Sequence, residues 1–156
     1  MGEASVDLVA CFQSLHWFNP KLTLPEFRRI LKPAGKLAVV WNNRDEDYDE
    51  FSQGYSHLIK RASNNHPVSS RMISVEPLQA SQLFSDVRCH TFAYRQALDL
   101  EELIGRAMSS SYVPREGLVQ QQFFADLKDL HNRFCDANGL VYLVYCTEVY
   151  LAQSAT

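Results

Sequence analysis

Residues 5–18 read SVDLVACFQSLHWF, and this stretch decides the fold. Its first part, residues 6–12, is a short and mostly apolar run, which is typical of a strand buried on both faces of a parallel sheet. A helical pattern follows over residues 23–31, and a second apolar run follows over residues 37–41. Strand, helix and strand at this spacing predict a right-handed parallel crossover unit.

The remaining segments continue the alternation. Thr23 and Glu26 form a capping box that places a helix start at Thr23, and Asp99 and Glu102 form another. Leu118 belongs to the apolar stripe expected to be buried on the long helix near the end. The other expected elements are helices over 46–62, 77–84, 99–108 and 115–135, strands over 87–97 and 140–153, and a polar loop over 63–74. This order predicts an α/β layered sheet.

The composition of the chain limits which classes of function are expected. The chain has 156 residues, 46% of them hydrophobic, and a formal net charge of -3, which fits one domain with a real core and predicts no nucleic-acid partner. No apolar run is long enough to span a bilayer, so no membrane partner is expected. The four cysteines lie far apart and the histidines lack ligand spacing, so reduced thiols in a cytoplasmic protein are expected, with no metal site.

Three segments carry a resemblance to a known family. The run 7–18, with D-L-V and then Q-x-L-H-W-F, resembles the fourth-strand motif of small-molecule class I S-adenosylmethionine-dependent methyltransferases. Residues 26–33 are similar to the helix that leads into the family's L-K-P-G-G turn, and residues 39–45 to its fifth strand and exit. The resemblance implies a partial Rossmann-like methyltransferase sheet, from the fourth strand onward, with helices on both faces.

The chain departs from the family pattern in two places. Ala34 stands where the family has the first glycine of the turn, and a type I geometry with Gly35 in the left-handed position would avoid strain there. The glycine-rich loop and the acidic residues that grip the rest of the cofactor have no counterpart, since the fourth-strand motif begins near Met1. Residues 1–156 are therefore expected to be a single domain that forms the C-terminal part of a methyltransferase domain.

The resemblance also implies a site. Cys11, Phe12 and Gln13 are implied to line the methionine end of S-adenosylmethionine, and Trp17, also a cofactor contact, and His16 are implied to lie beside the transferred methyl. His16 is the candidate general base because imidazole titrates near neutrality. Packing of His16 and Trp17 on the sheet is an equally weighted reading. The candidates to shape a pocket for a small-molecule acceptor are Trp41, Asn43 and Tyr112, and ordinary packing or surface placement is an at least equally weighted reading for each.

The expected function is methyl transfer to a small-molecule acceptor, as part of a longer or completed enzyme, and the chain alone is expected to be weak or inactive. A catalytically inactive truncated homologue that acts as a binding or assembly module is the alternative, and a split enzyme completed by a partner is a third reading. In family topology the fourth strand lies beside the first. Residues 6–12 would then present an open apolar edge, which predicts self-association through this strand.

Overall fold

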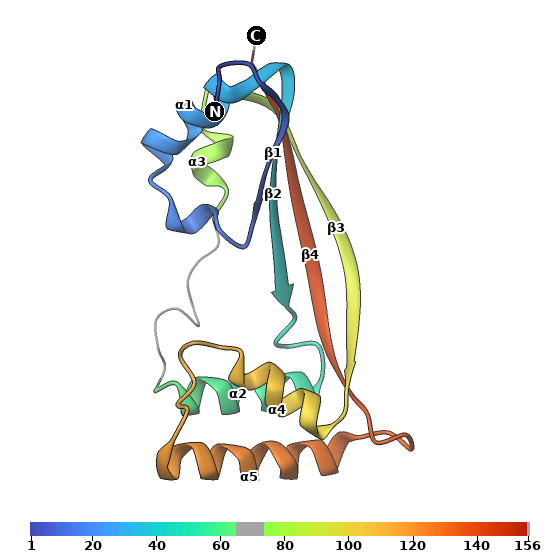
Figure 1. Cartoon of the computed structure of the whole chain (residues 1–156). Helices are drawn as coiled ribbons and strands as arrows, with labels where there is room; N and C mark the ends of the chain where they lie inside the picture. The colour runs from blue at the N-terminus through green and yellow to red at the C-terminus, as the bar shows by residue number, and fades with distance from the viewer. Residues whose placement is uncertain (65–73, 156) are drawn as a thin grey trace. The chain divides into compact units, whose positions relative to one another are not determined.

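The computed structural model describes residues 1–64 and 74–155, and these form a mixed α/β fold whose four strands lie in the order β1-β2-β4-β3 (Figure 1). The strands are β1 (Val6–Phe12), β2 (Leu31–Arg44), β3 (Phe84–Leu98) and β4 (Val141–Ser154). The helices are the 3₁₀ turn η1 (Leu15–Trp17), α1 (Pro20–Ile30), α2 (Glu50–Ala62), α3 (Glu76–Gln79), α4 (Leu100–Met108) and α5 (Gly117–Phe134). The expected α/β class is confirmed, and the loop expected over 63–74 lies largely outside the described residues.

The described residues group into two compact units. Unit 1 comprises residues 1–43, 74–92 and 146–155, and unit 2 comprises residues 44–64 and 93–145. The expectation of a single domain over 1–156 stays a prediction.

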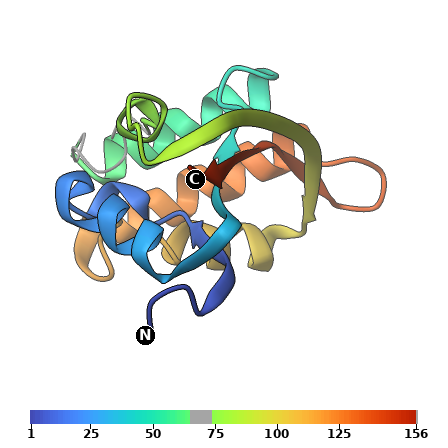
Figure 2. The same ribbon diagram turned by 90° about the horizontal axis from the view of Figure 1, so that it is seen from above.

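The crossover of unit 1 forms as predicted. β1 pairs in parallel with β2, and Cys11 and Phe12 lie opposite Val39 and Val40. α1 connects the two strands (Figure 2), and it contacts α3. The carboxyl end of β1 therefore lies beside the carboxyl-terminal half of β2, which is the edge of a parallel pair where ligands bind in open α/β sheets.

The start of α1 differs from the prediction. Asn19 caps the helix by accepting a hydrogen bond from the Lys21 backbone N–H at 3.1 Å, and Pro20 is the first helical residue. Thr23 therefore lies inside the helix, together with Pro25. Asparagine before a proline at the first position is itself a start signal, and it takes precedence over the later T-x-x-E pattern.

The burial of β1 also differs from the prediction. Only Cys11 in this strand is buried, whereas Leu8 is 54% exposed and Phe12 is 67% exposed. β1 stands at one end of the strand order, so it gains hydrogen bonds and packing from β2 on one side alone. The apolar composition of this run predicted a strand in the interior of a sheet. In the described chain, however, β1 is an edge strand.

The turn expected at Pro33–Gly35 lies within β2, at an irregularity near the start of that strand, and it has strained backbone geometry. Ala34 has φ +61°, in the left-handed region, so the type I alternative for this turn is wrong. Val6 pairs with Leu31 whereas Leu8 pairs with Lys36, so the chain leaves the regular register here. A Cβ on Gly35 would lie 2.9 Å from the Lys32 carbonyl oxygen. Glycine at 35 is therefore needed for close approach of backbone rather than for a left-handed φ.

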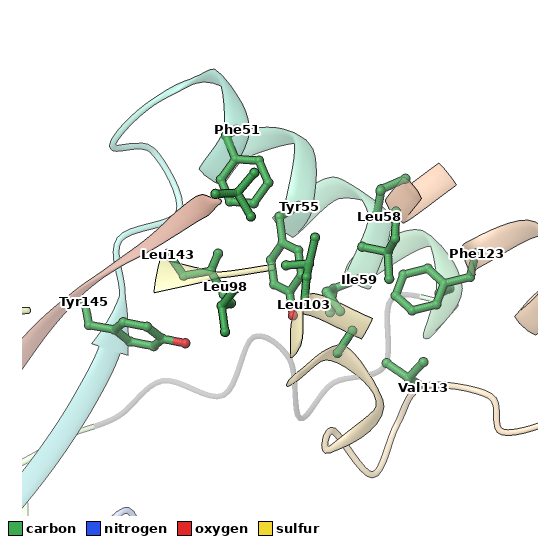
Figure 3. Close-up of a cluster of buried hydrophobic side chains, with 14 residues drawn as sticks. Phe51, Tyr55, Leu58, Ile59, Leu98, Leu103, Val113, Phe123, Leu143 and Tyr145 are labelled. Carbon is green, nitrogen blue, oxygen red and sulfur yellow. The ribbon is translucent and has the colours of Figure 1, made fainter. Parts of the chain in front are cut away.

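Unit 2 is built around three helices and the adjoining strand ends. α5 packs against α2 and α4, and their apolar side chains form one cluster with residues of β3 and β4 (Figure 3). The Asp99–Glu102 capping box at α4 is confirmed. Leu118 is 81% exposed rather than buried, because the buried stripe of α5 runs through Phe123 and Leu127 while Leu118 lies in the first turn.

Candidate functional site

In unit 1, Gln13 joins the end of β1 to the end of β2 through two hydrogen bonds. The Gln13 backbone N–H donates to the Val40 carbonyl at 2.9 Å, which extends the parallel pairing one residue beyond β1. Its side-chain amide donates to the Asn42 carbonyl oxygen, also at 2.9 Å. Gln13 has φ +49°, a conformation that residues with a Cβ rarely adopt. Strained backbone of this kind clusters at functional sites, where the surrounding structure holds it in place.

The next turn of chain places His16 among aromatic rings. Within η1 the His16 and Trp17 ring centroids lie 4.7 Å apart, and the His16 ring lies 5.3 Å from the ring of Trp41 in β2. Trp41 is completely buried, while Trp17 is 60% exposed. The His16 imidazole thus lies close to the rings of two other residues implied for the site, one from η1 and one from β2.

A pocket of about 270 Å³ opens beside His16 within unit 1. Its other lining residues are Leu15, Phe18, Pro20, Leu24, Ser74, Pro77 and Leu78. Leu15, Leu24 and Leu78 are buried, so the floor is apolar, and His16 and Ser74 are the polar groups on the wall. Apolar walls with few polar groups are the usual composition of a small-molecule site. Sequence reasoning found His16 but missed the contribution of α1 and α3, since nothing in the sequence pairs Leu24 with Leu78.

Trp41 and Asn43 both lie on β2, and the Asn43 side chain already has a hydrogen-bond partner. The Asn43 amide donates to Glu148 of β4 at 2.8 Å. Glu148 also accepts a hydrogen bond from the Tyr150 hydroxyl, at 3.4 Å. Glu148 was missed by sequence reasoning, because a single glutamate within an otherwise apolar strand has no local pattern that points to a partner on another strand.

Tyr112 is the one residue of the predicted acceptor pocket that belongs to unit 2. It follows α4, is half-buried, and packs against the apolar cluster of that unit. The other predicted residues, Cys11, Phe12, Gln13, His16, Trp17, Trp41 and Asn43, all lie in unit 1.

The electrostatics disfavour thiol chemistry at this site. Burial raises the pKa of the Cys11 thiol, and the hydrogen bond with Ser14 only partly opposes this effect. A neutral thiol is a poor nucleophile, so Cys11 behaves as a small packing residue. Among the described residues, no group of three or more His, Cys, Asp or Glu side chains is arranged to hold a metal ion. In the same part of the chain, no helix is both long and apolar enough to cross a bilayer.

Comparison with known proteins now adds to this geometry. Residues 1–39 match the profile of a methyltransferase domain. An uncharacterized methyltransferase of Mycobacterium tuberculosis strain H37Rv is 30% identical over an alignment 158 residues long. The alignment covers 97% of this chain and 61% of the relative. The resemblance to the class I methyltransferases is confirmed. An uncharacterized methyltransferase of Schizosaccharomyces pombe is 58% identical over 45 residues, covering 29% of this chain and 18% of that relative.

Solved structures support the methyltransferase fold. A candidate type II methyltransferase of Anaeromyxobacter dehalogenans superposes with a TM-score of 0.54 at 13% identity, covering 99% of this chain and 66% of that one. A candidate methyltransferase of Bacillus halodurans C-125 gives a TM-score of 0.50 at 18% identity, covering 100% and 67%. The chain spans 61% of the length of the mycobacterial methyltransferase that it matches.

Proposed function

We propose that this chain takes part in methyl transfer from S-adenosylmethionine to a small-molecule acceptor, as part of a longer or completed enzyme. The observation that carries the proposal is the arrangement at the end of β1. His16 lies close to the rings of Trp17 and Trp41, beside an apolar pocket of about 270 Å³. Methyl transfer to a small molecule needs the acceptor to be positioned, and many acceptors also need a base, so this arrangement supports the proposal.

The residues at the end of β1 fit the methionine end of the cofactor. Phe12 is 67% exposed and Trp17 is 60% exposed, so both present aromatic faces to a ligand. Aromatic faces attract cations, and the cofactor carries a sulfonium. Gln13 and Cys11 would hold the same end through the backbone around the positive φ. When bound, S-adenosylmethionine supplies the methyl group. The contacts to its ribose and adenine are expected to come from outside the described residues.

His16 is proposed to take the acceptor's proton, and Trp41 is proposed to position His16 rather than to touch the acceptor. Trp41 is completely buried and lies 5.3 Å from the imidazole, ring centre to ring centre. The acceptor then occupies the pocket that Leu15, Leu24 and Leu78 line beneath His16. Asn43, in the same unit, remains a proposed acceptor contact.

Both tryptophans of the chain, Trp17 and Trp41, lie at this site, so their indole N–H signals in NMR spectra report on it directly. Titration with S-adenosylmethionine is expected to shift them. Gln13→Ala is expected to weaken the affinity for S-adenosylmethionine by about tenfold or more, since it removes the hydrogen bond from the Gln13 side chain to β2. Gln82→Ala is the matched control, because Gln82 is exposed in the same unit. Shifts that survive unchanged in Gln13→Ala would contradict this site.

One observation favours the alternative of an inactive binding or assembly module. The exposed apolar side chains Leu8 and Phe12 lie on β1, which stands at one end of the strand order. An open apolar edge favours pairing with another strand, either of a second copy or of a completing chain. The module reading predicts no response of the tryptophan signals to S-adenosylmethionine, which separates it from the enzyme reading.

Self-association through β1 is testable by light scattering. Leu8→Lys places a charge on the edge strand and is expected to shift the protein toward monomer. Leu22→Lys changes a 72% exposed leucine on α1 and serves as the control. A native chain that stays monomeric at high micromolar concentration would contradict self-association.

A further inference from the structure

Unit 2 holds a half-buried cation without an acidic partner. Arg106 lies on α4, and its Nε donates to the Tyr145 hydroxyl at 3.2 Å while one terminal nitrogen donates to the Ser109 hydroxyl at 3.0 Å. Among the described residues, the ion pairs found include none with Arg106. Both of its hydrogen-bond partners are neutral, so within this part of the chain its charge meets the carboxyl-terminal end of α4 but no acidic side chain.

The neighbouring Arg44 shows how the same unit treats a cation that serves the fold. Arg44 pairs with Glu46 at 3.0 Å and donates to the Ser56 hydroxyl at 3.1 Å. Its guanidinium also lies 4.8 Å from the centre of the Tyr55 ring. Partly buried charges are costly unless they are paired, and Arg44 has an acidic partner in Glu46, although its Nε is buried without a hydrogen-bond partner. Arg106 is half-buried and has no such acidic partner among the described residues.

The groups around Arg106 are phenols rather than carboxylates. Tyr145 is 4% exposed, and its hydroxyl lies within the side-chain cluster of unit 2, as does the ring of Tyr55 (Figure 3). Burial raises the pKa of Tyr55 to about 12, although the charges of Arg44 and Arg106 act to lower it. Tyr55 is therefore neutral at physiological pH and cannot balance the charge. Tyr112 is also near enough to interact electrostatically with Arg106.

We propose that Arg106 binds the carboxylate of a small organic acid. Tyr145 and Ser109 fix the orientation of the guanidinium through two hydrogen bonds. The remaining N–H groups of Arg106 can donate to both oxygens of one carboxylate. The planar fork matches a carboxylate in shape and charge, and orienting it in advance lowers the entropic cost of binding. This site goes beyond the proposed methyl transfer and does not depend on it.

The test uses the whole chain and glutarate as the probe, with neutral glutaramide at the same concentrations. Glutarate is expected to shift the Arg106 Nε–H signal and the backbone amide signals of α4 in NMR spectra, and glutaramide is not. Arg106→Gln is expected to weaken glutarate binding, followed on the α4 amides, by about tenfold or more. Arg106→Lys keeps the charge but loses the fork, and it is expected to bind with an intermediate affinity.

The control is Arg115→Gln, which removes an exposed arginine of the same unit and is expected to change the affinity for glutarate by less than about twofold. Inorganic phosphate, at matched ionic strength, separates a carboxylate site from a phosphate site. Equal binding of glutarate by native protein and Arg106→Gln would overturn the proposal. So would tighter binding of phosphate than of glutarate, or the absence of α4 shifts with glutarate at tens of millimolar.

Discussion

Replacing Ala34 with glycine is expected to stabilise the protein. Ala34 is exposed and has φ +61°, a conformation that costs a residue with a Cβ about 1–2 kcal/mol. Glycine removes that cost but adds backbone entropy to the unfolded chain, worth about 0.5–1 kcal/mol. The net gain is expected to be about 0.5–1 kcal/mol, which raises the Tm by about 1–4 °C for a chain of this size.

The adjacent position supplies the opposite arm of the experiment. In Gly35→Ala the new Cβ would lie 2.9 Å from the carbonyl oxygen of Lys32 and 3.3 Å from that of Asp7, and both are backbone atoms. Overpacking of this kind costs about 1–3 kcal/mol, so the free energy of unfolding is expected to fall by that amount. Urea titration of the two variants beside the native chain measures both changes. A destabilised Ala34→Gly, or a neutral Gly35→Ala, would refute this reading of the turn.

Two further predictions concern unit 2. Leu118 is 81% exposed, so Leu118→Lys is expected to change the free energy of unfolding by less than about 0.5 kcal/mol. Leu127 is fully buried, so Leu127→Ala is expected to lower the free energy of unfolding by about 2–5 kcal/mol. Similar losses for the two variants in urea titration would contradict the assigned buried face of α5. The pKa of Asp136 is lowered, first by the hydrogen bond from the Leu140 backbone N–H and then by that from the Tyr142 hydroxyl. A depressed pKa in the folded state means that the carboxylate stabilises the fold above its unfolded pKa, and that this contribution is lost as the pH falls through the folded pKa. Tyr142→Phe is expected to raise the Asp136 pKa toward its ordinary value in carboxyl NMR titrations, and an unchanged value would argue against the hydrogen bond.

Local signals in the sequence predicted several elements well. The run 6–12 became β1 with the same bounds, and the Asp99–Glu102 box became the start of α4. These features depend on contacts only a few residues apart, or on a periodicity that the chain itself carries. The start of α1 at Asn19 was also readable, but the later Thr23–Glu26 pattern competed with it.

Features that depend on distant partners could not be predicted in the same way. The exposure of β1 follows from its place at the end of the strand order, and the composition of the run does not encode that place. The bond from Asn43 to Glu148 joins residues 105 positions apart, so no local spacing reveals it. At the candidate site, the motif supplied Gln13 and His16, while the pocket walls from α1 and α3 required the folded structure.

The central claim is that the end of β1 binds the methionine end of S-adenosylmethionine. The most direct measurement follows the indole N–H signals of Trp17 and Trp41 during separate titrations with S-adenosylmethionine, methionine and adenosine. The proposed site takes the methionine end, and the described residues include no glycine-rich loop for the adenosine end. S-adenosylmethionine and methionine are therefore expected to shift both signals, and adenosine is expected to have little effect. Shifts caused by adenosine alone, or no shift with any of the three ligands, would contradict the claim.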